Sequence, residues 1–228
     1  MVARLKRQLG SSFPLNVVRD TSKSGALLTT IRAHATRHSA SHHLILQDDA
    51  FLHPDFAEVL PACVELEPEA ALGLWTMKEN SARDGRWVEG YRECGGLAWC
   101  FPSELGAPIA KWLTACRKFA RAGSLSFDDA RVGDLIGEDM LRDLWLMSAG
   151  VRVLCPCPMI VAHGEPGKKH KSLYGHDYAP WYRNVGFLKG SGSEVDWVAG
   201  AANPMRYKTD QFEDIKACLP TVLLEQLP

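Results

Sequence analysis

Two adjacent carboxylates follow an apolar run near the start of the chain. Leu44, Ile45 and Leu46 are followed, after one residue, by Asp48 and Asp49. Such a run is typical of a buried strand, and open α/β sheets bind ligands at the carboxyl ends of their strands. A hard divalent cation such as Mg²⁺ or Mn²⁺ offsets the repulsion between neighbouring carboxylates, and it would also bind a diphosphate. The pattern predicts a metal site; the alternative is an acid pair that caps the next helix or lies in a solvated turn.

Two other segments carry groups that could take part in the same chemistry. Glu138 and Asp139 follow Gly137 and open a predicted helix, although the helix dipole by itself favours acids in a first turn. His163 follows the apolar run 159–162, where a lone histidine serves either as a metal ligand or as a structural side chain. Neither segment shows by itself which role its residues have. That role depends on the strands and helices that position these side chains.

The elements expected from the sequence alternate between strands and helices. This alternation predicts an α/β fold with a mostly parallel central sheet flanked by helices. We expect helices over 2–9, 25–38, 54–64, 108–121, 138–149 and 210–227, and strands over 15–18, 43–49, 71–75, 95–101, 151–154 and 159–162. We assign residues 1–190 to a catalytic domain. We expect residues 191–228 to form a C-terminal extension whose helix packs on the same domain through Phe212, Ile215, Leu219 and Leu223; the alternative is that this face makes a dimer contact.

Charge and cysteine content exclude some classes of protein. The chain of 228 residues has 26 Lys and Arg against 27 Asp and Glu, which argues against nucleic-acid binding by overall charge. The charge is nevertheless distributed in blocks. Residues 1–43 hold seven Lys or Arg and one acid, whereas residues 44–69 hold seven acids and no Lys or Arg. The seven cysteines include one C-x-C at 155–157 and no second pair, so we expect buried thiols rather than a zinc site. No apolar run has the length of a secretory signal or a membrane span, and we expect a cytoplasmic protein.

Four motifs together resemble those of the GT-A fold glycosyltransferases. Asp48-Asp49, Gly95-Gly96, Gly137-Glu138-Asp139 and His163 follow the order and approximate spacing of that family's Asp-x-Asp region, glycine loop, x-Glu-Asp motif and metal-binding histidine. The resemblance covers roughly residues 10–175 and implies a Rossmann-related sheet. The chain departs from the family at its start, because Met1 leads almost directly into the first helix. We therefore expect that the family's usual first strand is missing, is replaced by another segment, or lies outside this sequence.

The resemblance implies a metal-bound nucleotide sugar. Asp49 and His163 would coordinate Mn²⁺ or Mg²⁺ on the diphosphate of a UDP-sugar, and Asp48 would share the metal or contact the ribose. Asp20 would hold the nucleotide. These roles come from the family's pattern and not from the spacing of the residues.

The resemblance also implies how the sugar is transferred. Asp139 would be the general base that takes the proton of the acceptor hydroxyl, which implies inversion at the anomeric carbon. Glu138 would position hydroxyl groups of donor or acceptor. Gly95 and Gly96 would let the backbone approach the sugar closely.

The acceptor is best sought in residues 164–189. This segment holds five Lys or Arg, two acids and the aromatic residues Tyr174, Tyr178, Trp181 and Tyr182. Bases and aromatic rings together are typical of single-stranded or flipped-base recognition, although such rings also stack on sugars or pack on a core. Lys168 and Lys169 could bind the donor diphosphate, as part of a lid that orders on substrate binding.

Small GT-A enzymes without an anchor include bacteriophage enzymes that glycosylate hydroxymethylated pyrimidines in DNA, and this chain is similar to them in being short and locally basic. We favour such DNA, for example with 5-hydroxymethylcytosine in a host cytoplasm, narrowly over a bacterial glycan. Two other classes stay open. One is a metal-dependent phosphoesterase or nucleotidyltransferase that uses Asp48 and Asp49, and the other is a non-catalytic nucleic-acid or carbohydrate-binding module.

Overall fold

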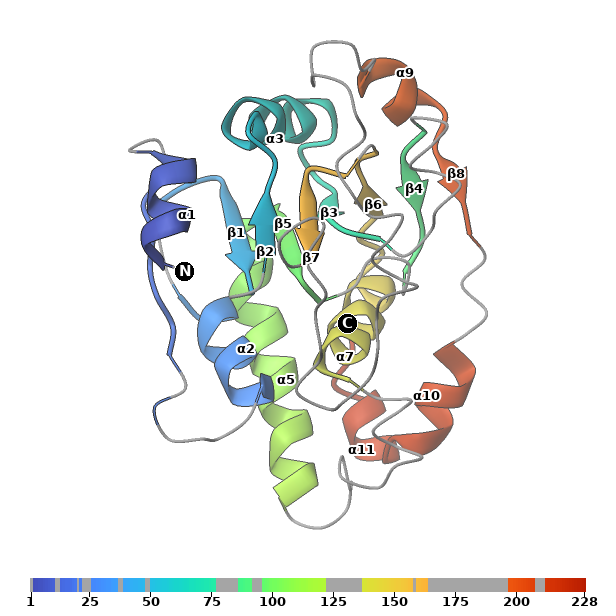
Figure 1. Ribbon diagram of the computed structural model, residues 1–228. Coiled ribbons are helices and arrows are strands. Elements are labelled where there is room, and N and C mark those ends of the chain that lie inside the picture. Colours follow the sequence, from blue (N-terminus) through green and yellow to red (C-terminus); the bar gives the residue numbers. More distant parts are fainter. Residues whose placement is uncertain are drawn as a thin grey trace.

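The computed structural model describes most of the chain (Figure 1). The described residues are 2–10, 13–19, 21, 26–36, 39–47, 50–76, 86–91, 96–121, 137–157, 159–163, 197–207 and 212–228. Of the predicted site residues, Asp20, Asp48, Asp49, Gly95, Lys168 and Lys169 lie outside them.

Six strands form the central sheet. Its order is β1 (His42–Leu46), β5 (Ala98–Pro102), β3 (Ala71–Gly73), β6 (Val153–Cys155), β4 (Val88–Glu89) and β8 (Met205–Arg206). A separate two-stranded sheet joins β2 (Ala50–Leu52) to β7 (Val161–His163).

The α/β class is confirmed. The central sheet agrees in part with the expected mostly parallel arrangement. Strands β1, β3 and β6 run in one direction, but β5 lies antiparallel between β1 and β3. Strand β4 is antiparallel to β6 and parallel to β8. Parallel neighbours need a crossover connection, usually a helix, and the described residues between β3 and β5 contain none. The direction of β5 could therefore not be predicted from the alternation of strands and helices in the sequence.

Helices cover both faces of the sheet (Figure 1). Helices α2 (Ala26–His34), α5 (Gly106–Arg121) and α7 (Glu138–Ser148) contribute to one hydrophobic core. Helices α1 (Val2–Leu9), α3 (Phe56–Leu66) and α9 (Trp197–Ala202) contribute to the other. A short 3₁₀ helix, Ser103–Leu105, leads into α5. None of the helices in the described part of the chain has the length and apolar character that crossing a membrane requires.

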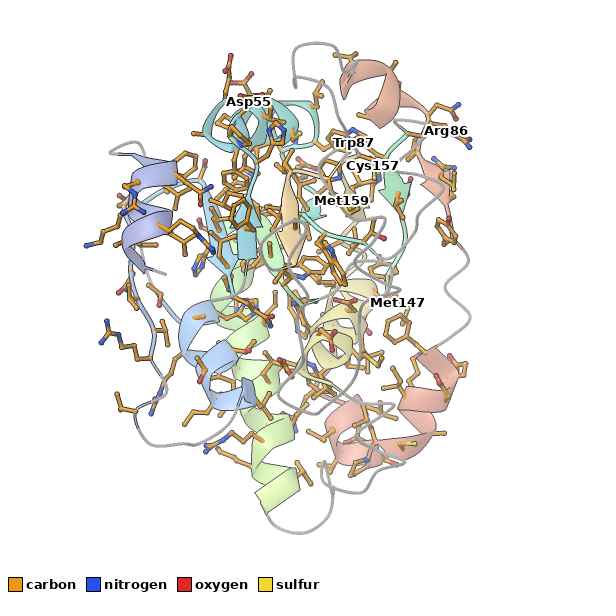
Figure 2. All side chains as sticks on the ribbon, in the orientation of Figure 1. Asp55, Arg86, Trp87, Met147, Cys157 and Met159 are labelled. Carbon is orange, nitrogen blue, oxygen red and sulfur yellow. The ribbon has the colours of Figure 1, made fainter. Side chains whose placement is uncertain are left out.

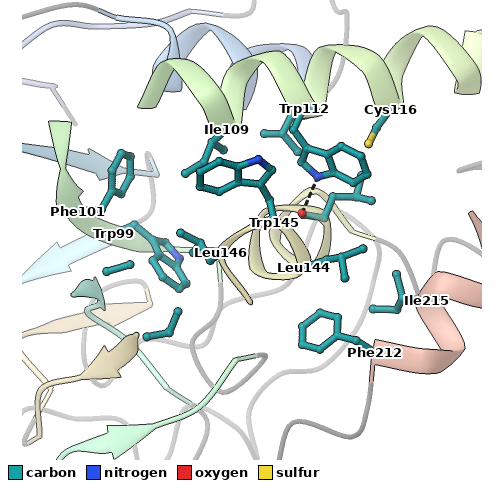
Figure 3. Close-up of a cluster of buried hydrophobic side chains, with 14 of the residues drawn as sticks. Trp99, Phe101, Ile109, Trp112, Cys116, Leu144, Trp145, Leu146, Phe212 and Ile215 are labelled. Atoms are coloured by element: carbon teal, nitrogen blue, oxygen red, sulfur yellow. Dashed lines mark hydrogen bonds between the residues drawn. The ribbon is translucent and has the colours of Figure 1, made fainter. Parts of the chain in front are cut away.

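Strand β5 separates the two cores because every one of its residues is buried. Trp99 and Phe101 point to the α5–α7 core, whereas Ala98 and Cys100 belong to the α1–α3 core. This alternation follows from the two-residue period of a strand. Figure 3 shows Trp99 and Phe101 against residues of α5 and α7, where the indole of Trp112 donates a hydrogen bond of 2.8 Å to a carbonyl oxygen of α7.

Two predicted elements differ from the structure. Residues 15–18 form no strand, because the half-exposed to exposed segment 13–19 pairs with no described strand, despite its β-branched residues. The first strand among the described residues is therefore β1. The expected helix over 210–227 is two helices, α10 (Glu213–Cys218) and α11 (Thr221–Leu224). Pro220 lies between them, and it lacks the N–H that a continuous helix needs.

The apolar face of the C-terminal extension packs on the core as predicted. Phe212, Ile215, Leu219 and Leu223 are all buried in the α5–α7 core. Phe212 and Ile215 face Leu144 of α7 in Figure 3. The extension is thus part of the same folded unit.

Truncation of a buried residue of α11 should destabilise the whole fold. Leu223→Ala is expected to lower the free energy of unfolding by about 2–5 kcal/mol, because Leu223 is fully buried. Val222→Ala is the matched control, since Val222 is 48% exposed, and its cost should be within about 0.5 kcal/mol. Urea denaturation of both variants measures the difference. Equal costs would show that α11 does not share the core.

Candidate functional site

The end of β1 meets the start of β5. The N–H of Gln47 donates to the carbonyl oxygen of Leu97 at 2.9 Å, which continues the pairing of Leu46 with Ala98. This brings Gln47, the residue before the acid pair, beside the residues that follow the predicted glycine loop.

The segment after the acid pair meets the end of β7. Ala50, the residue that follows Asp49, is paired with His163 in the antiparallel β2–β7 sheet. The guanidinium of Arg4 in α1 donates to the carbonyl oxygen of Ala50 at 2.6 Å and lies over the ring of Phe51. The backbone of the predicted metal-binding histidine therefore lies opposite the residue next to the acid pair. The side chains of Asp48, Asp49 and His163 lie outside the described part.

The third motif is the amino-terminal turn of α7. Gly137 is the N-cap, and the Oδ1 atom of Asp139 accepts a hydrogen bond of 2.9 Å from the N–H of Met140. A Cβ atom on residue 137 would stand 2.5 Å from this Oδ1. A side chain at position 137 would therefore displace the carboxylate of Asp139 from its place over the helix start.

Gly96 lies where the first and third motifs meet. A Cβ atom on residue 96 would lie 3.3 Å from Nε2 of Gln47, 3.5 Å from Cβ of Asp139 and 3.9 Å from Oδ2 of Asp139. The structure therefore gives a reason for this glycine beside the predicted approach to a sugar. A side chain here would press on the amide of Gln47 and contact the side chain of Asp139.

Glu138 has an unusual electrostatic environment. Burial is the main cause that raises its pKa above the ordinary value, and the charge of Asp139 raises it further. A backbone hydrogen bond of Glu138 and the cation of Arg142 act in the opposite direction. Glu138 therefore holds its proton more readily than a solvated glutamate, which suits a group that donates a hydrogen bond to a substrate oxygen.

Arg142, one turn further along α7, was not singled out in the sequence. It is 3% exposed, pairs with Asp143 at 2.9 Å and lies 3.8 Å over the ring of Trp99. The sequence signal that could have pointed to Arg142 is its position four residues after Glu138, since that spacing brings two side chains to one helix face. Arg142 supplies positive charge behind the two acids of the helix start.

A buried histidine lies near this cation. His34 of α2 is 2% exposed, and its ring stacks on Phe101 with centroids 5.1 Å apart. Burial, Arg142 and His43 lower its pKa to about 3, so the ring is neutral at physiological pH. We assign it to the core rather than to the site.

Five of the described cysteines are buried free thiols as predicted, whereas Cys218 is exposed and Cys94 lies outside the described residues. Cys155 and Cys157 are buried free thiols, and Cys157 is labelled in Figure 2. Its thiol donates weakly to the carbonyl oxygen of Cys155 at 3.6 Å. Within the residues that the structure describes, no three His, Cys, Asp or Glu side chains are grouped to hold a metal ion. The side chains of the predicted ligands lie outside these residues.

Two surface hollows lie away from these motifs. One, of about 130 Å³, lies between β4, β6 and β8 and is lined by Glu89, Tyr91 and Arg206 among others. The other, of about 330 Å³, runs along α5 beside Lys111 and Lys118. Of the predicted site residues that the structure describes, none lines either hollow.

Comparisons with protein-family models, curated proteins and solved structures find no match. The resemblance to GT-A enzymes consequently rests on the four sequence motifs.

The raised pKa of Glu138 predicts a pH-dependent gain in stability on its removal. The pKa of Glu138 is higher in the folded state than in the unfolded state. Deprotonation of Glu138 therefore lowers the free energy of unfolding, and this loss grows as the pH rises from the unfolded-state pKa through the folded-state pKa. Glu138→Gln should therefore unfold at a higher temperature than the wild type at neutral pH, with the difference vanishing below about pH 4. Thermal unfolding from about pH 4 to about pH 8 measures this.

Glu104→Gln, at an exposed glutamate, is the control and should show no such rise. A Glu138→Gln curve that stays parallel to that of the wild type across this pH range would contradict the environment described for Glu138.

Proposed function

We propose that this protein is a metal-dependent, inverting glycosyltransferase of the GT-A kind, which moves a sugar from a UDP-sugar to a hydroxyl acceptor. The observation that carries the proposal is the convergence at Gly96. There, the side chains of Gln47, the residue before the acid pair, and of Asp139, the predicted general base, both come within 4 Å of the point where a Cβ of residue 96 would stand, although 92 positions separate them in the sequence. The pairing of Ala50 with His163 brings the fourth motif to the other side of the acid pair.

Asp139 is suited to act as the general base. Its Oδ1 is engaged by the N–H of Met140, which orients the carboxylate, and its Oδ2 is the atom nearer to Gly96. Asp139 is half-buried and so accessible to a substrate. A base needs this combination of a fixed orientation and one oxygen within reach of the hydroxyl proton. Glu138, beside it, would position hydroxyl groups.

The donor side of the site is proposed from the motifs. Asp49, Asp48 and His163 would hold Mn²⁺ or Mg²⁺, whose preferred ligands include carboxylate oxygen and, for Mn²⁺, imidazole nitrogen. The β2–β7 pairing fits this set, because it joins the two segments at adjacent backbone positions. When bound, the ion neutralises charge on the departing diphosphate.

The nucleotide contacts rest on the motif resemblance and on the charges in the sequence. Asp20 would hold the nucleotide. Lys168 and Lys169 would bind the diphosphate, since their ammonium groups are point charges suited to phosphate oxygens.

The acceptor that we favour is DNA with hydroxymethylated pyrimidines. The support is the mixture of bases and aromatic residues in 164–189, which suits phosphates and an unstacked base. A bacterial glycan is the second candidate, because the same aromatic rings can stack on sugars. Both acceptors present a hydroxyl to the same base.

Incubation with nucleotide sugars should release UDP only when the right acceptor is present. The screen combines UDP-sugars with DNA containing 5-hydroxymethylcytosine, unmodified DNA and oligosaccharides. Asp139→Asn should lower transfer by about 10²–10⁴-fold, since the amide cannot accept the proton, and should leave UDP binding unchanged. Transfer at the wild-type rate by this variant would refute the base assignment.

Absence of UDP release in every combination would contradict the glycosyltransferase proposal. Phosphate or nucleotide release that requires Asp48 and Asp49 would instead favour the phosphoesterase or nucleotidyltransferase class. DNA or glycan binding without turnover would favour the binding module.

Removal of divalent metal should abolish transfer and weaken UDP binding. Chelation followed by addition of Mn²⁺ or Mg²⁺ is expected to restore both, whereas Asp49→Asn should require far more metal for half-maximal activity. Calorimetric titration of UDP with and without Mn²⁺ measures the coupling. Asp55→Asn, at an acid three residues after β2, is the matched control and should keep the wild-type metal response. Metal-independent UDP binding and transfer would overturn the metal assignment.

A further inference from the structure

Gln47 lies at the candidate site, although no motif includes it. Its backbone follows β1 and is held by the hydrogen bond to Leu97. Its side-chain Nε2 lies 3.3 Å from the point where a Cβ of residue 96 would stand, and Oδ2 of Asp139 lies 3.9 Å from the same point. Gln47, Gly96 and Asp139 are all half-buried. An amide and a carboxylate thus both lie close to Gly96, which has no side chain, and all three residues are partly exposed.

The two groups have complementary hydrogen-bonding chemistry. Oδ1 of Asp139 already accepts from Met140, so Oδ2 is the oxygen that faces Gly96. An ionised carboxylate only accepts hydrogen bonds, whereas the NH₂ of a glutamine side chain donates two. A hydroxyl group both donates and accepts, and it can therefore bind to both groups at once.

We propose that Gln47 is a second contact for the acceptor hydroxyl, acting beside Asp139; this inference rests on the proposed function. Nε2–H of Gln47 donates to the hydroxyl oxygen, and the hydroxyl proton passes to Oδ2 of Asp139. The oxygen's electron pair forms the new bond to the anomeric carbon. The bond from that carbon to the diphosphate breaks, and its electron pair leaves with UDP.

Gly96 is part of the same arrangement. Even one methyl group at this position would lie 3.3 Å from Nε2 of Gln47 and 3.5 Å from Cβ of Asp139, and so would crowd both side chains. Gly96→Ala should therefore interfere with the acceptor while leaving the donor side of the site intact.

The proximity of the two groups is tested without any activity. In ¹⁵N-labelled protein, the side-chain NH₂ resonance of Gln47 is assigned by its loss in Gln47→Met. This resonance should shift in Asp139→Asn. Gln226 is the internal control, because its Nε2 donates a hydrogen bond of 3.0 Å to the carbonyl oxygen of Val222 in α11. Its side-chain resonance should not shift. An unmoved Gln47 resonance, or an equal shift of Gln226, would overturn the inference.

The role in catalysis is tested with the donor and acceptor found by UDP release. Gln47→Met should lower kcat/KM for the acceptor about 10-fold, the worth of one hydrogen bond, and leave KM for the UDP-sugar unchanged. Gln47→Glu keeps the shape and replaces the donor NH₂ by a carboxylate oxygen, so it should lower kcat/KM at least as much. Gln226→Met should match the wild type.

Wild-type kcat/KM in both Gln47 variants would overturn the assignment. If the resonance shifts but no combination of substrates releases UDP, the proposed function fails and the catalytic role of Gln47 falls with it. The shift would then still establish the convergence of Gln47 with Asp139, so the two failures are distinguishable.

Discussion

The pairing of β1 with β5 is the contact on which the candidate site depends. Its register runs from His42 opposite Pro102 to Leu46 opposite Ala98, and the Gln47–Leu97 hydrogen bond extends it by one residue. This register brings Gly96 beside Gln47. A slip of one residue would turn every side chain of β5 to the opposite face, which its burial in two cores forbids. The same packing that stabilises the sheet therefore fixes the geometry at its edge.

Two ionisable residues of α7 lie in environments that disfavour a charged side chain. Burial beside a second carboxylate raises the pKa of Glu138, and Arg142 is buried with its charge matched by the neighbouring Asp143. A helix with apolar residues at these positions would pack on Trp99 at lower electrostatic cost. Groups that break a local rule in this way are concentrated at functional sites in proteins. This agrees with a base at the amino terminus of α7 and with a supporting cation behind it.

The local elements could largely be predicted from the sequence. Helices α1 and α7 end at Gly10 and Gly150, whose φ angles of 62° and 68° are those that glycine adopts readily. The buried face of α5 repeats at helical spacing through Ile109, Trp112 and Cys116. The error over residues 15–18 has a physical reason, because β-branched residues favour a strand only where another strand offers hydrogen bonds.

The sequence by itself determined where most helices and strands form, and that acids follow β1 and open α7. These properties depend on hydrophobic period, turn residues and capping, which act within a few positions along the chain. Only the tertiary structure decided the antiparallel direction of β5, the burial of Arg142 and the meeting of Gln47 with Asp139 across Gly96. Such contacts join residues far apart in the chain, and they arise from how two cores pack on one sheet. No local pattern around Gln47 records them.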